Sequence, residues 1–264
     1  DHAEQHDHLH QGIGQPQPIR RIRRKKEVEL LVRGTPVRSK NFSWEFTATF
    51  TRNRNKVVEL FPGTEQLGLG GFTGGAMVAK VGQPYGSFFG SSFLRSPDGN
   101  IVVDATTGYP IIDPEAKIHG NVQPDFLAGL NNSFSYKGFS LSFLFDTRKG
   151  GVFYSRTRSL QEFLGTDPRT LYNDRQPFVV PGSVVIDANG KYIPNTTPVQ
   201  NPENYWTSFS ATTAMEHLID GIFIKLRAVS FAHRLPAGLF KNNALKVITV
   251  GLSGRNLWLR TPKE

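Results

Sequence analysis

Four histidines near the amino end are the residues best suited to metal chemistry: His2, His6, His8 and His10. Imidazoles at alternate positions can bind a transition metal, but ligands on a single tail seldom fix one coordination geometry. A basic run follows from Arg20 to Lys26, without the aromatic residues that favour nucleic acid. We therefore interpret residues 1–26 as an atypical His-rich and basic leader that is disordered, and residues 27–264 as the folded part.

The folded part shows no set of residues typical of catalysis. His119, His217 and His233 are isolated in the sequence and form no H-E-x-x-H motif. The glycine-rich run Gly70–Gly75 lacks the Lys-Ser/Thr pair of a phosphate-binding loop, so it predicts a flexible loop. No G-x-S-x-G motif for a nucleophile is present. We predict that the chain is not an enzyme and holds no cofactor or metal.

One aromatic pair, Tyr205-Trp206, is our candidate for ligand binding. It lies inside a long connection between two predicted strands. Connections of this kind often carry binding residues, and an aromatic ring there can stack on the face of a sugar. The alternative is that the pair packs within the connection itself. Of the two interpretations, the sequence favours packing within the connection.

Composition and charge narrow the classes of protein further. The net charge is +9, but six of the 31 basic residues lie in the leader, between Arg20 and Lys26. The rest of the chain is mildly basic without a basic stripe, so we expect no nucleic-acid partner. There is no cysteine, which excludes disulfides and thiolate chemistry. A low mean hydropathy of −0.33 is compatible with membrane strands, because these alternate apolar and polar residues.

Hydrophobic residues recur with period two, which predicts strands. In Lys40–Thr51 the even positions are apolar and the odd positions are polar. In Gly221–His233 the same alternation places His233 on the polar side together with Lys225 and Arg227. We predict an all-β protein with about six strands. Their ranges are 27–34, 40–51, 125–136, 139–147, 220–234 and 245–259.

The strand lengths and connections are typical of a transmembrane antiparallel β-barrel. Strands of about 10 residues suit a tilted membrane crossing. Short turns at Gly34–Ser39, Lys137-Gly138 and Leu235–Ala244 alternate with two long connections, Leu60–Pro124 and Arg148–Ile219. Bacterial barrels have short periplasmic turns and longer extracellular loops. Six strands cannot close a barrel, so we expect a partial barrel with two long extracellular loops.

Several stretches of the folded part carry a resemblance to a known family. They are Lys40–Trp44, Asn53–Val58, Val81–Gly90, Gly120–Phe126, Ser135–Leu141, Phe223–Arg227 and Ser253–Trp258. In this order they resemble the barrel of SusC/RagA-type TonB-dependent (TonB-linked) outer-membrane transporters, in its C-terminal portion.

The resemblance implies a fragment of an importer of oligosaccharides or peptides in the bacterial outer membrane, not competent alone. It also implies three kinds of partner: a SusD-like surface lipoprotein, TonB and outer-membrane lipid. A soluble β-sandwich that serves as a carbohydrate-binding module is the alternative, since it shows the same alternation. The residues do not identify the substrate.

Overall fold

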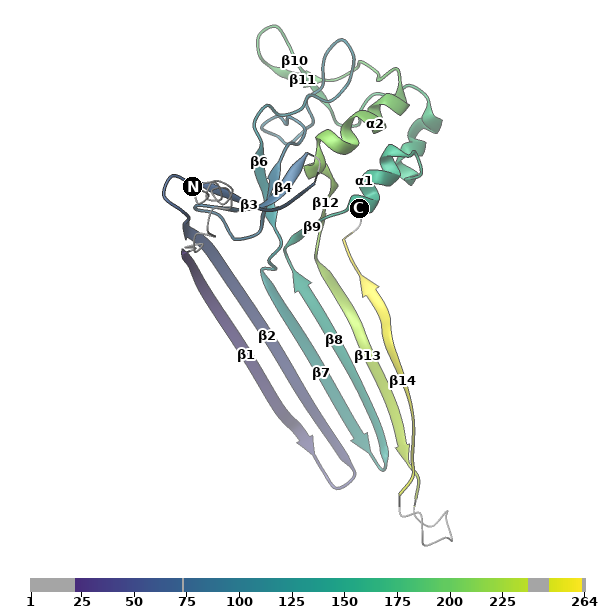
Figure 1. The fold of residues 1–264 in the computed structure, drawn as a ribbon. Coiled ribbons are helices and arrows are strands. Elements are labelled where there is room, and N and C mark those ends of the chain that lie inside the picture. Colours follow the sequence, from purple (N-terminus) through teal and green to yellow (C-terminus); the bar gives the residue numbers. More distant parts are fainter. Residues whose placement is uncertain (1–21, 73, 237–246, 263–264) are drawn as a thin grey trace, which may run out of the picture.

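A computed structural model describes residues 22–72, 74–236 and 247–262. The chain forms a long antiparallel sheet that carries a smaller mixed body at one end (Figure 1). We call the first part the main sheet and the second, residues 60–124 and 150–222, the loop body. No helix in these described ranges is long and apolar enough to cross a membrane.

The main sheet has six strands in the order β1-β2-β7-β8-β13-β14, and each neighbouring pair is antiparallel. Its strands are β1 (Ile22–Arg38), β2 (Phe42–Glu59), β7 (Phe126–Tyr136), β8 (Phe139–Lys149), β13 (Phe223–Arg234) and β14 (Thr249–Arg260). The predicted all-β class is confirmed, and each predicted range overlaps one of these strands. Residues 245 and 246 of the last range lie outside the described residues.

The cross-strand register gives the main sheet two different faces. Residues that pair directly across two strands point to the same side. One side, which we call the apolar face, is dominated by apolar and aromatic residues. The opposite side, the polar face, carries mainly Ser, Thr, Asn and charged residues. Representative residues of the apolar face are Val28, Leu30, Val32, Phe42, Trp44, Phe46, Phe50, Leu130, Phe134, Tyr136, Phe139, Leu141, Phe143, Phe145, Leu226, Val229, Phe231, Val250 and Leu252.

A bulge in β13 corrects one predicted position. The register shifts between Leu226 and Ala228, so Arg227 is an extra residue that β8 does not match. A bulge of this kind reverses the alternation beyond it. His233, predicted on the polar side, therefore lies on the apolar face, where its ring stacks on Phe139 with centroids 3.9 Å apart. Strict alternation could not show this.

Tight turns join the strands at the end of the sheet away from the loop body (Figure 1). Lys137 and Gly138 have φ of 44° and 87°, the left-handed pair that a two-residue hairpin requires, as predicted. The turn predicted at Gly34–Ser39 lies later. β1 continues through a register shift to Arg38, and the chain reverses at residues 39–41. The predicted turn at Leu235–Ala244 lies mostly outside the described residues.

The predicted disordered leader is wrong for its last five residues. Residues 22–26 belong to β1 and pair with the distal part of β2, for example Lys26 with Arg54. Backbone hydrogen bonds to β2 extend the strand although its side chains are charged. Residues 1–21, including the four clustered histidines, lie outside the described residues.

The loop body combines small sheets with short helices. One sheet contains β3 (Gln66–Phe72), β4 (Gly75–Lys80), β5 (Ser87–Gly90) and β6 (Lys117–Asn121). Two strand pairs are β9 (Val152–Tyr154) with β12 (Leu218–Asp220), and β10 (Val184–Ile186) with β11 (Tyr192–Pro194). The helices are α1 (Arg156–Phe163), α2 (Pro202–Thr212) and the 3₁₀ segments η1 (Pro168–Arg175) and η2 (Ala214–His217).

The glycine-rich run is a second correction. Gly70–Gly75 was predicted to be a flexible loop, but most of it belongs to the hairpin of β3 and β4. At Gly75 glycine is required by close packing, because a Cβ there would overlap Met215 Cε and lie 3.1 Å from Phe72 Cε2. This end of the run therefore serves packing inside the loop body.

The buried apolar core lies in the loop body and at its junction with β2. Its largest cluster contains Val103, Phe178, Val180, Val185 and Val199. The apolar face of the main sheet is exposed instead, and no second sheet packs on it within the described residues. A β-sandwich requires such a second layer, so the described fold does not support the alternative prediction.

Candidate ligand site

Tyr205 and Trp206 lie on α2, whose start follows from local sequence. Asn201 caps the helix, since its Oδ1 accepts a hydrogen bond from the Asn204 amide at 2.9 Å. Pro202 occupies the first turn, where its missing N–H costs nothing. Consecutive positions on a helix are about 100° apart, so these two aromatic residues point in different directions.

Tyr205 belongs to the core of the loop body. Its ring meets Phe178 edge-on at 5.3 Å and Phe209 at 5.7 Å. Burial raises the pKa of Tyr205 to about 12, and the negative charges of Glu162 and Glu216 add to the effect. For this residue packing within the connection is the better interpretation.

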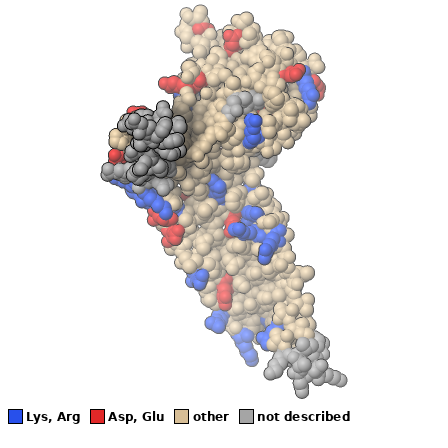
Figure 2. All heavy atoms as spheres, in the orientation of Figure 1, with Lys and Arg blue, Asp and Glu red and all other residues tan. Residues whose placement is uncertain are grey.

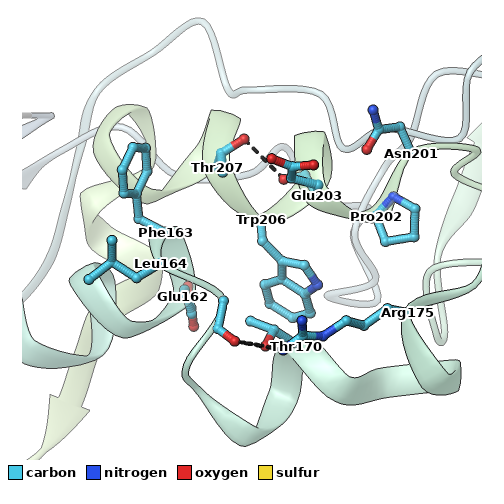
Figure 3. A pocket seen from close by; sticks show the side chains of 11 residues that line it. Glu162, Phe163, Leu164, Thr170, Arg175, Asn201, Pro202, Glu203, Trp206 and Thr207 are labelled. Carbon is cyan, nitrogen blue, oxygen red and sulfur yellow. Dashed lines mark hydrogen bonds between the residues drawn. The ribbon is translucent and has the colours of Figure 1, made fainter.

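Trp206 lines an open cavity of about 480 Å³. Figure 3 shows its indole directed from α2 toward the segment that joins α1 to η1. The cavity is bounded by the end of α1, by η1 and by the first turn of α2. Its lining residues are Glu162, Phe163, Leu164, Gly165, Thr170, Arg175, Asn201, Pro202, Glu203, Trp206 and Thr207.

The wall opposite Trp206 is held by hydrogen bonds to one backbone carbonyl. Thr170 Oγ1 donates to the Gly165 carbonyl at 3.0 Å, as drawn in Figure 3, and an Arg175 guanidinium nitrogen donates to it at 2.8 Å. The exposed Glu203 adds a carboxylate at the rim. An aromatic wall beside a few polar groups suits an amphipathic ligand such as a sugar ring or a short peptide.

A partly buried ionic network is centred on Glu162, which also lines this cavity. Glu162 contacts Arg169 at 2.6 Å, Arg158 at 3.5 Å and His217 Nε2 at 2.6 Å. His217 was isolated in the sequence, but the fold brings it to a carboxylate 55 residues away. Both Glu162 oxygens have partners. We therefore infer that the role of the network is structural and that it holds α1, η1 and η2 together. Opposite charges offset the cost of burying each other in such a group.

His119, the other isolated histidine of the loop body, does not line this cavity. His119 is half-buried, and its inaccessible Nε2 has no hydrogen-bond partner among the described residues. Burial lowers the pKa of His119, while the Gly90 carbonyl and the carboxylates of Glu216 and Asp113 oppose this. No cluster of three or more potential metal ligands occurs in the ranges described. Neither observation tests activity.

We compared the chain with family models and with curated proteins of known name. No family model matches the chain. It is 24% identical over 255 residues to TonB-dependent receptor P3 of Formosa agariphila, covering 88% of this chain and 24% of that receptor. TonB-dependent receptor P26 of the same organism is 26% identical over 258 residues, with the same coverage of each protein. The chain thus spans about a quarter of the length of these curated relatives.

Solved structures share the fold. The RagAB peptide transporter superposes with a TM-score of 0.64 at 20% identity, over 91% of this chain and 26% of that one. The chain resembles SusC/RagA-type TonB-dependent receptors. This confirms the resemblance found in the sequence, and it makes the chain a protein of the bacterial outer membrane. The proteins that it resembles are named receptors and transporters.

Proposed function

We propose that the main sheet is part of the wall of an outer-membrane barrel that imports oligosaccharides or peptides. The observation that carries this proposal is the pair of unlike faces. Along β2 the outward positions from Phe42 to Phe50 are all apolar, while Ser43, Glu45 and Thr47 lie on the polar face. Such a stretch has the length of a tilted membrane strand, about 9–11 residues. The apolar face would meet lipid and the polar face would line the lumen.

Aromatic residues on the apolar face support this arrangement. Trp44, Tyr136 and Phe139 gather near the short turns, and Trp44 stacks on Phe134 with ring centroids 5.9 Å apart. Trp258 lies nearer the opposite end, paired with Leu226. Aromatic girdles occupy both interfaces of barrel proteins. Trp44 also donates its indole N–H to Asn132 at 3.0 Å, which satisfies a buried amide on this face.

The connections support one orientation of the sheet in the membrane. Short turns lie at one end and the loop body lies at the other (Figure 1). Because outer-membrane barrels have short periplasmic turns, the loop body would face the cell exterior. The cavity beside Trp206 would then meet substrate before it enters the lumen.

The substrate class and partners follow from resemblance and belong to the proposal. Relatives named TonB-dependent receptors support coupling to TonB, and the RagAB peptide transporter supports peptides as one class of cargo. A SusD-like surface lipoprotein would assist capture above the loop body. We expect no catalytic step, and the wall described here would need the remainder of a barrel to function.

Replacing Trp206 by alanine tests the proposed capture site. The full receptor would be expressed in a host that lacks it, and uptake of labelled oligosaccharides and peptides would be measured against concentration. Loss of one aromatic wall should weaken apparent affinity about tenfold, since such contacts contribute ~1 kcal/mol or more. Tyr192→Ala is the matched control, because Tyr192 is an exposed aromatic residue of β11 outside this cavity.

Equal uptake by the Trp206 and Tyr192 variants would refute this capture site. No uptake of either ligand class by the wild-type receptor would refute the proposed cargo. Surface protein levels of all three proteins would be matched, so that a folding defect is not read as a binding defect.

A further inference from the structure

The upper end of the apolar face carries a row of cations where the apolar residues stop. On β2 the outward positions after Phe50 are Arg52, Arg54 and Lys56, all exposed. On β1 the corresponding residues are Lys26, which pairs with Arg54, and Arg24, which pairs with Lys56. We call these five residues the basic patch: Arg24, Lys26, Arg52, Arg54 and Lys56. Figure 2 shows basic side chains at this end of β1 and β2, with acidic ones nearby.

The acidic residues of β1 lie on the other face. Glu27 pairs with Asn53 and Glu29 pairs with Thr51, which places both on the polar face. Within the described ranges, the only carboxylate that neutralises the basic patch is Asp125, which contacts Arg54 at 2.7 Å. The remaining four cations have no ion-pair partner in this part of the chain.

Like charges that face each other across a strand pair destabilise the pair. Lys26 opposite Arg54 and Arg24 opposite Lys56 are two such contacts in succession. The alternate residues of β2 have a clear structural role: Val57 is buried, and Asn55 Oδ1 accepts a hydrogen bond from the Tyr85 amide at 2.7 Å. The cations take no part in that packing. Their arrangement is therefore complementary to an external anion.

Two further cations lie on the apolar face at the same end of the main sheet. Lys149 pairs with Phe126, and Arg260 pairs with Ile224, so both lie on the apolar face at the end of their strands next to the loop body. Both side chains are exposed. Positive charge spread over several strand ends, next to an apolar band, has the geometry of a membrane interface and not of a compact ligand pocket.

We infer that the basic patch binds phosphate-bearing lipid headgroups of the outer membrane's external leaflet. The inference rests on the barrel orientation proposed above, which directs the apolar face to lipid. Headgroup phosphates would lie between the cations of β1 and β2 and remove the repulsion across the strand pair. Their acyl chains would cover Val28, Leu30 and Phe50 directly below. Two residues of the basic run, Arg24 and Lys26, thus gain a role at the membrane interface.

A fourfold variant of the full receptor tests the inference: Arg24→Gln, Lys26→Gln, Arg52→Gln and Lys56→Gln. The control removes four cations near the opposite end of the sheet: Arg38→Gln, Lys40→Gln, Lys137→Gln and Arg234→Gln. Each protein would be purified in mild detergent and titrated with lipid A, with dephosphorylated lipid A and with inorganic phosphate. Bound lipid would be counted by native mass spectrometry.

The wild type and the control should bind lipid A alike, and the patch variant should bind at least about tenfold more weakly. Dephosphorylated lipid A should bind the wild type as weakly as lipid A binds the patch variant. Unchanged lipid A binding by the patch variant would overturn the inference. So would inorganic phosphate that competes with lipid A at equal concentration, since the site would then be one for free anions.

Membrane insertion would be measured separately by the heat-dependent gel mobility of each protein. Failure of the wild type to insert would refute the barrel proposal itself. Normal insertion of the patch variant with unchanged lipid binding would refute only the lipid inference. The two proposals therefore fail in distinguishable ways.

Discussion

Two adjacent residues, Tyr205 and Trp206, have different roles because they lie on a helix. Tyr205 fills the core beside Phe178, whereas Trp206 faces an open cavity. The sequence identified the pair but could not separate its members, because the helix was not predicted. A start signal was present in Asn201-Pro202-Glu203, a helix cap followed by proline and an acidic residue. The helix itself is short and lacks a clear helical repeat of apolar residues, so the start signal alone did not lead to its prediction.

His119 makes the stability of the loop body depend on pH. Burial holds its pKa below the usual value in the folded protein, whereas the unfolded chain titrates near ~6.5. As pH falls below that value, the unfolded state binds a proton that the folded state does not, so stability decreases. His119→Gln should reduce the drop in thermal stability between about pH 7 and pH 5. Identical pH profiles for the variant and the wild type would contradict this.

At the scale of elements, the strands were predictable and their irregularities were not. Period-two alternation identified all six strands of the main sheet, because each separates apolar from polar residues. The bulge at Arg227 left no recognisable mark, since an extra polar residue beside an alanine does not visibly break the pattern. Only pairing with β8 reveals it. The contact between His217 and Glu162 was not predictable either, because the two residues are 55 positions apart in the sequence.

Two single deletions should have opposite effects. Removing Arg227 makes Leu226 and Ala228 consecutive, which matches the regular run of β8 opposite them. We expect the folded amount in the outer membrane to stay within about twofold of wild type, because the deletion removes the Arg227–Asp146 ion pair but no pairing between β13 and β8. Removing Ser142 should abolish folding, because it moves Leu141 to the polar face. Heat-dependent gel mobility measures both; equal loss in the two variants would contradict the register.

At the scale of the molecule, the chain has two parts that treat apolar residues in opposite ways: one buries them and the other exposes them. The loop body buries an apolar cluster and the Glu162–His217 pair, as a water-exposed domain does. The main sheet exposes its apolar residues on one face, which only lipid would make favourable. The sequence could indicate the sheet because alternation is local. It could not indicate the core of the loop body, because valines from residues 103 to 199 assemble through long-range contacts.

The central claim is that the two faces of the main sheet meet different media. The chain has no cysteine, so introduced thiols report from single positions in it. Leu130 and Asn131 are consecutive, exposed residues in the middle of β7, the first on the apolar face and the second on the polar face.

Leu130→Cys and Asn131→Cys would each be introduced into the full receptor in outer-membrane vesicles and treated with a charged, membrane-impermeant maleimide. The variant at Asn131 should react and the variant at Leu130 should not, because a thiol in hydrocarbon remains protonated and out of reach of the reagent. Nitroxide labels at the two sites should show the matching contrast: the label at position 130 should be more accessible to dissolved molecular oxygen than the label at position 131. Equal reactivity at both positions, or the reverse order, would contradict the account.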